Sequence, residues 1–364
     1  MRLTRVLFLL ALGGAAPVFA QSTAATAPPL KSNAADLPTI VVSGVQPGPG
    51  MWKVSRGDHV MWVLGTLSPL PRQMQWESHD LAQVIRQSQQ VLLAPSLKLK
   101  ADIGFFGKLF LLPAAYSARK NDHGETLQQV LPAPEYARWQ VLKQKYLGHD
   151  RGIERWRPIF AAQKLYKKAL KANGLSNSGG VGDTVDALSK QFGVKEIPVT
   201  YRAVIEKPRA AIRAFKRSGV NDTECFSRTM DSIEQDMPAI TARANAWATG
   251  DLQALRQLPD SDRRSVCVSA LADAGFAHQL GLDDLPARLE AAWLAAAGAA
   301  LQANRQTFAM LPMRELLSPG GYLDRLKAQG YAVESPEDQD AAPASGSSIG
   351  APDVAAAPLI GPPS

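Results

Sequence analysis

Residues 61–68 have the sequence MWVLGTLS, a strand-like run that passes through Gly65 and Thr66 and then turns at Ser68. The apolar, β-branched and aromatic side chains of residues 60–67 favour an extended conformation. Another short run, residues 51–54, precedes it across the polar turn 55–58, which predicts a β-hairpin. The chain is therefore expected to begin its folded part with two paired strands, and Ser68 follows the second.

A further strand-like run, residues 307–311, lies near the other end of the chain. The pattern between these strands is mostly helical, above all from residue 208 to residue 301. This order predicts an α/β fold with a mixed sheet built from two halves and a large helical middle region. The other expected elements are helices at 80–89, 127–147, 157–172, 184–192 and 321–329, and short strands at 91–93, 197–199 and 331–333.

The N-terminus has the features of a cleavable signal peptide. Arg2 and Arg5 precede eleven apolar residues, 6–16, and Val18-Phe19-Ala20 provides small residues for a cut after Ala20. The alternative is a membrane anchor, but eleven helical residues span only about 16 Å of a ~30 Å hydrocarbon core. Residues 1–20 are thus predicted to direct export, and no transmembrane segment is expected in the mature chain.

Two segments flank the predicted domain, which covers residues 49–333. Residues 21–48 are rich in Ala, Pro, Ser and Thr and are expected to form a flexible leader. Residues 334–364 form an acidic tail rich in Pro and Ala, with few large apolar side chains to offset the entropy of ordering. This tail is expected to be disordered.

The charge is unevenly distributed. The formal net charge is +7; the signal peptide contributes +2 and the tail −5, which leaves +10 for residues 21–333. Such a charge can attract anionic surfaces or polysaccharides through its long-range field, and it is equally compatible with solubility alone. Nucleic acid is excluded as a partner, because export separates the protein from it and no binding module is recognisable.

The chain has two cysteines, Cys225 and Cys267. In an oxidising compartment an isolated pair favours a structural disulfide over two reactive thiols. Closing a loop of roughly 43 residues stabilises a fold by up to ~4 kcal/mol in the chain-entropy model. A disulfide between Cys225 and Cys267 is therefore predicted.

Several segments in a fixed order resemble the TraB/GumN family, proposed metal-dependent hydrolases related to the Tiki metalloproteases. The similarity extends from about residue 51 to residue 333. The resemblance implies the family's α/β fold and a periplasmic location. It rests on the hairpin with Trp52 and residues 62–66, the Leu70-Pro71 step, residues 157–162, the sequence AWATGD at 246–251, and the closing segment 307–333.

The chain departs from the family pattern at the positions that carry its chemistry. In the family a Gly-x-x-His motif closes each of the two strands; here Ser68 occupies the first histidine position and Glu315 the second. A strand glutamate of the family falls on Ala94, or on Pro95 with a shift of one. The family's Arg-Asn pair falls on Leu289-Glu290.

These replacements argue against a metal mechanism. A catalytic zinc usually keeps three protein ligands and a water, whereas a serine hydroxyl is a poor ligand and one glutamate does not make a site. The five histidines, at positions 59, 79, 123, 149 and 278, are scattered. No metal site and no cofactor are therefore expected, and a divalent metal would require a rebuilt site.

The resulting hypothesis is an exported pseudoenzyme that binds a peptide, a glycan or an envelope protein. The residues expected to take part in binding are Trp62, Gly65, Thr66 and Arg314.

The alternative is a hydrolase or peptidase with a rebuilt active site that uses Ser68 and Glu315 as catalytic residues. His59 cannot serve Ser68, because nine residues of strand separate the two by about 30 Å. A role in exopolysaccharide export or envelope maintenance is suggested by family context only.

Overall fold

The structure, a computed structural model, describes residues 44–72, 74–76, 79–101, 105–177, 180–205, 207–217, 222–259 and 284–341. All of them belong to one unit, Thr39–Ser364. The expected signal peptide, most of the leader, Cys267 and the tail from residue 342 lie outside the described residues. Cys225 is buried in the helical region, and its pairing with Cys267 stays a prediction.

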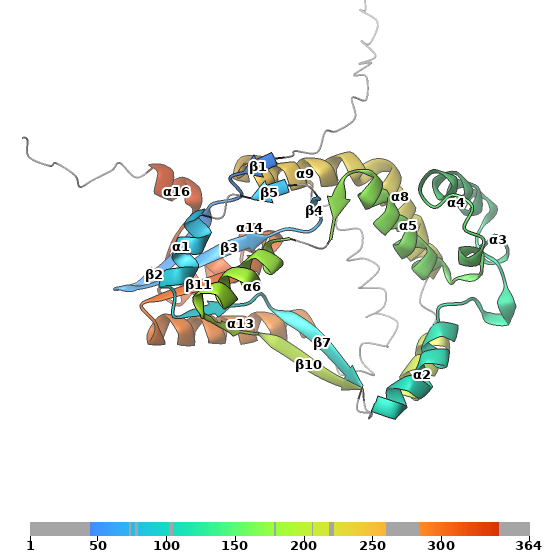
Figure 1. The fold of residues 1–364 in the computed structure, drawn as a ribbon, viewed down its shortest axis with the longest axis horizontal. Helices are drawn as coiled ribbons and strands as arrows, with labels where there is room; N and C mark the ends of the chain where they lie inside the picture. The colour runs from blue at the N-terminus through green and yellow to red at the C-terminus, as the bar shows by residue number, and fades with distance from the viewer. Residues whose placement is uncertain are drawn as a thin grey trace, which may run out of the picture. The chain divides into compact units, whose positions relative to one another are not determined.

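A six-stranded sheet has the order β12-β2-β3-β11-β6-β9 (Figure 1). Strands β2 (Met51–Arg56) and β3 (His59–Thr66) form the expected antiparallel hairpin. Strand β11 (Gln306–Pro312) lies between β3 and β6 and is parallel to both. A strand from the end of the chain thus completes a sheet begun at its start, which confirms the predicted mixed α/β fold. The other strands are β6 (Gln90–Leu92), between β11 and β9, and the two edge strands β9 (Lys195–Ile197) and β12 (Ala332–Glu334).

Three smaller strand pairs lie outside this sheet. The longest joins β7 (Ser96–Ala101) and β10 (Thr200–Ile205) in parallel, and the sequence pattern predicted neither strand. The paired residues of the two strands are about a hundred positions apart in the chain, so local periodicity carries little information about this pairing. The other pairs are β1 (Gly44–Gln46) with β5 (Met74–Trp76), and β4 (Leu70–Pro71) with β8 (Leu175–Ser176).

The helical middle region is confirmed in the described residues. Two helices differ from the sequence prediction. The single helix expected at 127–147 is two helices, α3 (Leu127–Val130) and α4 (Ala133–Tyr146), because Pro132 lacks a backbone donor and Pro134 fits only a first turn. The residues after Glu334 continue into helix α16 (Pro336–Ala341), so order extends past the expected start of the tail.

The remaining helices follow the chain in order. Among the described residues no helix is long and apolar enough to cross a bilayer. They are α1 (His79–Gln87), α2 (Phe105–Ser117), α5 (Pro158–Ala172), α6 (Val181–Phe192), α7 (Pro208–Arg217), α8 (Asp222–Asp231), α9 (Met237–Thr249), α10 (Leu252–Gln257), α13 (Leu285–Ala303), α14 (Met313–Leu317) and α15 (Tyr322–Ala328), with a π-helical turn at Ser232–Asp236.

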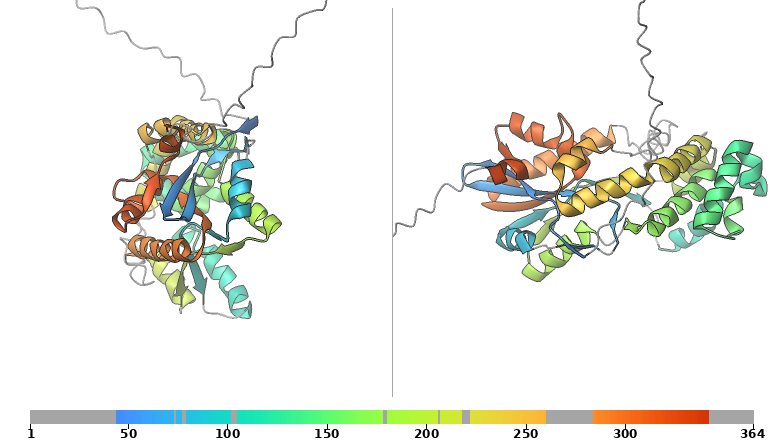
Figure 2. Two further views of the ribbon diagram at one scale, coloured as in Figure 1. Left: turned by 90° about the vertical axis from the view of Figure 1, so that its left-hand side faces the viewer. Right: turned by 90° about the horizontal axis from the view of Figure 1, so that it is seen from above.

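The buried apolar side chains form two clusters, which we call the sheet core and the helical core. The sheet core surrounds β3 and β11, and the helical core joins α4, α5 and α8. Helix α9 contributes to both: Met237 and Ile240 lie in the helical core, and Trp247 lies in the sheet core. Figure 2 shows this helix, in yellow, running from the strands toward the helical group.

Trp247 fastens α9 to the end of β3. Its indole N–H donates a buried hydrogen bond of 2.8 Å to the carbonyl oxygen of Gly65. On Gly65 itself, an added Cβ would lie 2.4 Å from Cε of Met313 and 3.0 Å from Cδ1 of Leu316. Glycine is therefore required here for close packing of α14 on the strand rather than for backbone conformation.

The substitution Gly65→Ala is expected to lower the free energy of unfolding by about 1–3 kcal/mol, the usual cost of overpacking a core. The measurement is chemical denaturation of the two proteins. Gly182→Ala is the matched control, because an added Cβ meets nothing within 4 Å there. An unchanged midpoint for Gly65→Ala would show that Met313 moves aside without cost.

Candidate functional site at the carboxyl edge of the sheet

The carboxyl ends of β3 and β11 lie side by side. The two strands are parallel, with Leu311 opposite Gly65 and Pro312 opposite Thr66. The Thr66 hydroxyl donates a hydrogen bond of 3.2 Å to the carbonyl oxygen of Leu311, which fastens one strand end to the other. Ser68 and Glu315 follow these paired ends by two and three residues, so the topology brings both to one edge of the sheet.

Ser68 is exposed, and its hydroxyl donates to Oδ1 of Asn177 at 3.2 Å. The acceptor follows β8, which pairs with β4 just after Ser68 in the chain. The hydroxyl is therefore oriented toward a neutral amide, and an amide oxygen does not supply the strong base that a serine nucleophile needs.

Glu315 lies on α14, and its carboxylate forms an ion pair of 3.0 Å with Arg314. The side chains are 30% and 54% exposed, respectively. Arg314, expected to contact a ligand, thus already neutralises the neighbouring carboxylate. Such an exposed pair contributes little to stability.

An apolar side chain separates the two strand exits. Met313, the first residue of α14, is fully buried and packs on Gly65.

Trp62 lies four residues before Thr66, about 13 Å along the strand. It is opposite Phe308 in the middle of the sheet and is packed against the sheet core.

A buried tyrosine adjoins this edge. Tyr322 begins α15 and packs edge-on against Trp293, with ring centroids 5.4 Å apart. Burial, and then the negative charges of Glu315 and Glu290, raise the pKa of Tyr322 to about 12. Its phenol is thus a neutral hydrogen-bonding group at ordinary pH. No motif singles out Tyr322 in the sequence beyond its place in the closing segment.

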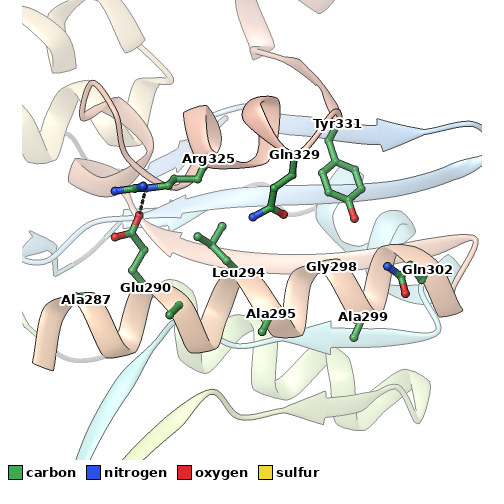
Figure 3. Close-up of a pocket in the computed structure, with 11 residues that line it drawn as sticks. Ala287, Glu290, Leu294, Ala295, Gly298, Ala299, Gln302, Arg325, Gln329 and Tyr331 are labelled. Atoms are coloured by element: carbon green, nitrogen blue, oxygen red, sulfur yellow. Dashed lines mark hydrogen bonds and ion pairs between the residues drawn. The ribbon is translucent and has the colours of Figure 1, made fainter.

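An open groove with a volume of about 800 Å³ lies along helix α13. Helix α13 forms one wall, and α15 with Tyr331 forms the other (Figure 3). At one end Arg325 pairs with Glu290 at 3.0 Å. The groove is lined by Ala287, Glu290, Ala291, Leu294, Ala295, Gly298, Ala299, Gln302, Arg325, Gln329 and Tyr331.

The residues at the strand ends do not fit a divalent metal. The side-chain oxygens that could coordinate a metal there are the hydroxyls of Thr66 and Ser68 and the carboxylate of Glu315. Both hydroxyls are hydrogen-bonded to the protein, and the carboxylate is paired with Arg314. Across the described part of the chain, no three His, Cys, Asp or Glu side chains gather as ligands. His59 begins β3 at the opposite end, with Nδ1 2.8 Å from the carbonyl oxygen of Asn304.

Comparison with known proteins gives one family. Residues 50–335 match the model of the TraB/PrgY/gumN family. Neither a curated protein nor a solved structure matches the chain.

Glu315→Gln is expected to lower the pKa of Tyr322 from about 12, because it removes a negative charge that disfavours the phenolate. Ultraviolet titration of the tyrosines measures this, with Tyr322→Phe assigning the signal. Because the pKa of Tyr322 lies above the ordinary tyrosine value of 10.0, this group's contribution to stability is complete below pH 10 and is lost as the pH rises through about 12. Glu337→Gln, on α16, is the control and should leave the pKa of Tyr322 unchanged. If this control lowered the pKa of Tyr322 as much as Glu315→Gln does, the effect could not be assigned to Glu315.

Proposed function

Because the chain belongs to the TraB/PrgY/gumN family and its strand ends lack metal-binding chemistry, we propose that it is an exported, non-hydrolytic member. In this proposal it binds an extended peptide segment, free or within an envelope protein, in the groove along α13. The observation that carries the proposal is the open groove beside the carboxyl edge of the sheet.

Three contacts support the absence of hydrolysis. Met313 fills the space over Gly65, Ser68 donates to an amide, and Glu315 is paired with Arg314. General-base catalysis needs a base within hydrogen-bond reach of the nucleophile, and these partners occupy both candidate groups.

The position of the groove supports ligand binding. Helix α13 ends at Ala303 and the chain returns along β11, so the start of the helix lies at the carboxyl edge of the sheet. Burial raises the pKa of Tyr322, and the negative charges of Glu315 at that edge and Glu290 in the groove lining raise it further. A ligand in the groove would therefore lie next to the strand ends.

The lining favours a peptide over a glycan. Small side chains of α13 leave room for an extended backbone, and the amides of Gln302 and Gln329 can both donate to and accept from peptide groups. Sugars in binding sites commonly stack on aromatic faces. Tyr331, the aromatic residue of this lining, is 6% exposed, and Arg56 lies 3.8 Å from the centroid of its ring.

The sequence of residues 1–20, the expected signal peptide, supports export to the periplasm. Its basic residues, its apolar run and the small residues before Gln21 suit cleavage after Ala20. Mass measurement of the protein recovered from expressing cells tests this part of the proposal.

The second candidate function is hydrolysis by Ser68 with Glu315. One observation favours it: both residues follow the paired ends of β3 and β11. It requires the carboxylate to leave Arg314 and approach the hydroxyl.

Filling the groove is expected to abolish peptide capture. Ala295→Arg places a long charged side chain in the groove, whereas Ala292→Arg alters an exposed position of the same helix outside it. Immobilised proteins are incubated with a pool of random-sequence synthetic peptides, and retained peptides are identified by mass spectrometry. The wild type and Ala292→Arg should retain a common set of peptides. Ala295→Arg should bind these peptides at least about tenfold more weakly, a difference of about 1.4 kcal/mol in binding free energy. Equal retention by all three would contradict the groove as the site.

Ser68→Ala and Glu315→Gln distinguish the two functions. If the protein only binds peptide, neither variant should change peptide capture by more than about twofold, which is under about 0.5 kcal/mol of binding free energy. The wild type should also cleave no more peptide than either variant. The measurement is cleavage of a fluorogenic peptide library, together with metal content by elemental analysis. Cleavage by the wild type that both variants lose would refute the non-hydrolytic proposal and establish the second candidate.

A further inference from the structure

A second surface combines exposed apolar side chains with basic side chains. It consists of β7, α2, β10 and α7, and we call it the basic apolar surface. Strands β7 and β10 pair in parallel, helices α2 and α7 follow them in the chain, and the two helices contact each other (Figure 1). The surface uses neither the groove nor the strand ends.

Helix α2 is apolar along most of its length. Its thirteen residues, FFGKLFLLPAAYS, contain one charged side chain, Lys108. Leu112 and Tyr116 are 60% and 56% exposed, and Val204 of β10 is 51% exposed. These are three of the five large apolar side chains that are exposed in the described part of the chain. At 1.5 Å per residue the helix is about 20 Å long, too short to cross a ~30 Å hydrocarbon core.

All charged residues in the elements of this surface are basic. Its four elements carry eight basic residues and no acidic one: two in β7, one in α2, one in β10 and four in α7. The whole chain has a net charge of only +7. One acidic side chain reaches the surface from outside, because Asp122 lies 3.3 Å from Lys216.

Two arginines of α7 are exposed, and an aromatic side chain of the same helix packs inward. Phe215 packs against Phe160, with centroids 6.1 Å apart, on the inner side of the helix. Arg209 and Arg213, one helical turn apart, are both exposed. On α2, which contacts α7, Tyr116 has Lys120 Nζ 4.9 Å from its ring centroid. Tyrosine with neighbouring cations is typical of residues that sit at a membrane–water interface.

We propose that the basic apolar surface docks on an anionic phospholipid membrane, with α2 lying in the headgroup region and the basic side chains of α7 bound to lipid phosphates. Charge complementarity selects an anionic occupant, and the exposed apolar side chains select one with an apolar interior. Interfacial helices combine these two features. A soluble polyanion would satisfy the arginines but leave Leu112 and Tyr116 in water.

The test is co-sedimentation of the full chain with phosphatidylglycerol vesicles and with phosphatidylcholine vesicles at about 0.1 M salt, where charges interact over ~10 Å. Two double variants probe the surface: Arg209→Glu with Arg213→Glu, and Leu112→Asp with Tyr116→Asp. Two matched controls alter exposed side chains elsewhere: Lys167→Glu with Lys168→Glu on α5, and Val141→Asp on α4. The N-terminal apolar run is common to all five proteins.

The wild type should bind phosphatidylglycerol vesicles more tightly than phosphatidylcholine vesicles. A basic side chain at an anionic surface contributes a factor of about five in affinity, so the Arg209/Arg213 variant should lose at least about tenfold. The Leu112/Tyr116 variant should lose at least about tenfold because it replaces apolar contacts with two carboxylates. Each control should change binding less than about twofold. Thermal unfolding verifies that the variants fold, and Arg209→Gln with Arg213→Gln provides a milder substitute.

Three results would overturn the proposal. The first is an equal loss in the Lys167/Lys168 control, which would indicate net charge alone. The second is a loss on arginine reversal with none on Leu112/Tyr116 substitution, which would indicate a soluble polyanion. The third is unchanged binding in both surface variants.

Discussion

The arrangement of the molecule depends on the buried hydrogen bond between the indole of Trp247 and the carbonyl oxygen of Gly65. An unpaired buried polar group costs about 1–3 kcal/mol, so each partner needs the other. The bond holds α9, which joins the two cores, against the end of β3. Trp76 packs edge-on against the same indole, with centroids 5.5 Å apart, and Gly48 donates to the carbonyl oxygen of Ala248 at 2.8 Å.

Packing and strand pairing also account for Gly65 and Thr66 at the ends of β3 and β11, without reference to catalysis. Gly65 must lack a side chain because Met313 and Leu316 pack on it, and Thr66 bonds across to β11. Both requirements concern packing and strand pairing. The identity of residues 68 and 315 is not constrained by either, because both side chains lie beyond the paired strand ends.

The groove and the basic apolar surface belong to different elements and carry different chemistry. The groove lies along α13 and has a balanced ion pair at one end, between Glu290 and Arg325. The basic apolar surface lies on β7, α2, β10 and α7, which contain no acidic residue. A protein bound to a membrane through the second surface could still present the first to a peptide, so the two proposals stand independently.

The linear pattern established the hairpin, the helical middle region and the family, because each depends on local periodicity or on motifs such as AWATGD at 246–251. It also identified Ser68 and Glu315 as replaced positions. Folding was needed to show that β11 lies between β3 and β6, that β7 pairs with β10, and that Tyr322 lies near both Glu290 and Glu315. The strand pairings join residues that are 104 to 246 positions apart. The energy of such contacts comes from burial and pairing with a distant partner, which no local window of sequence contains.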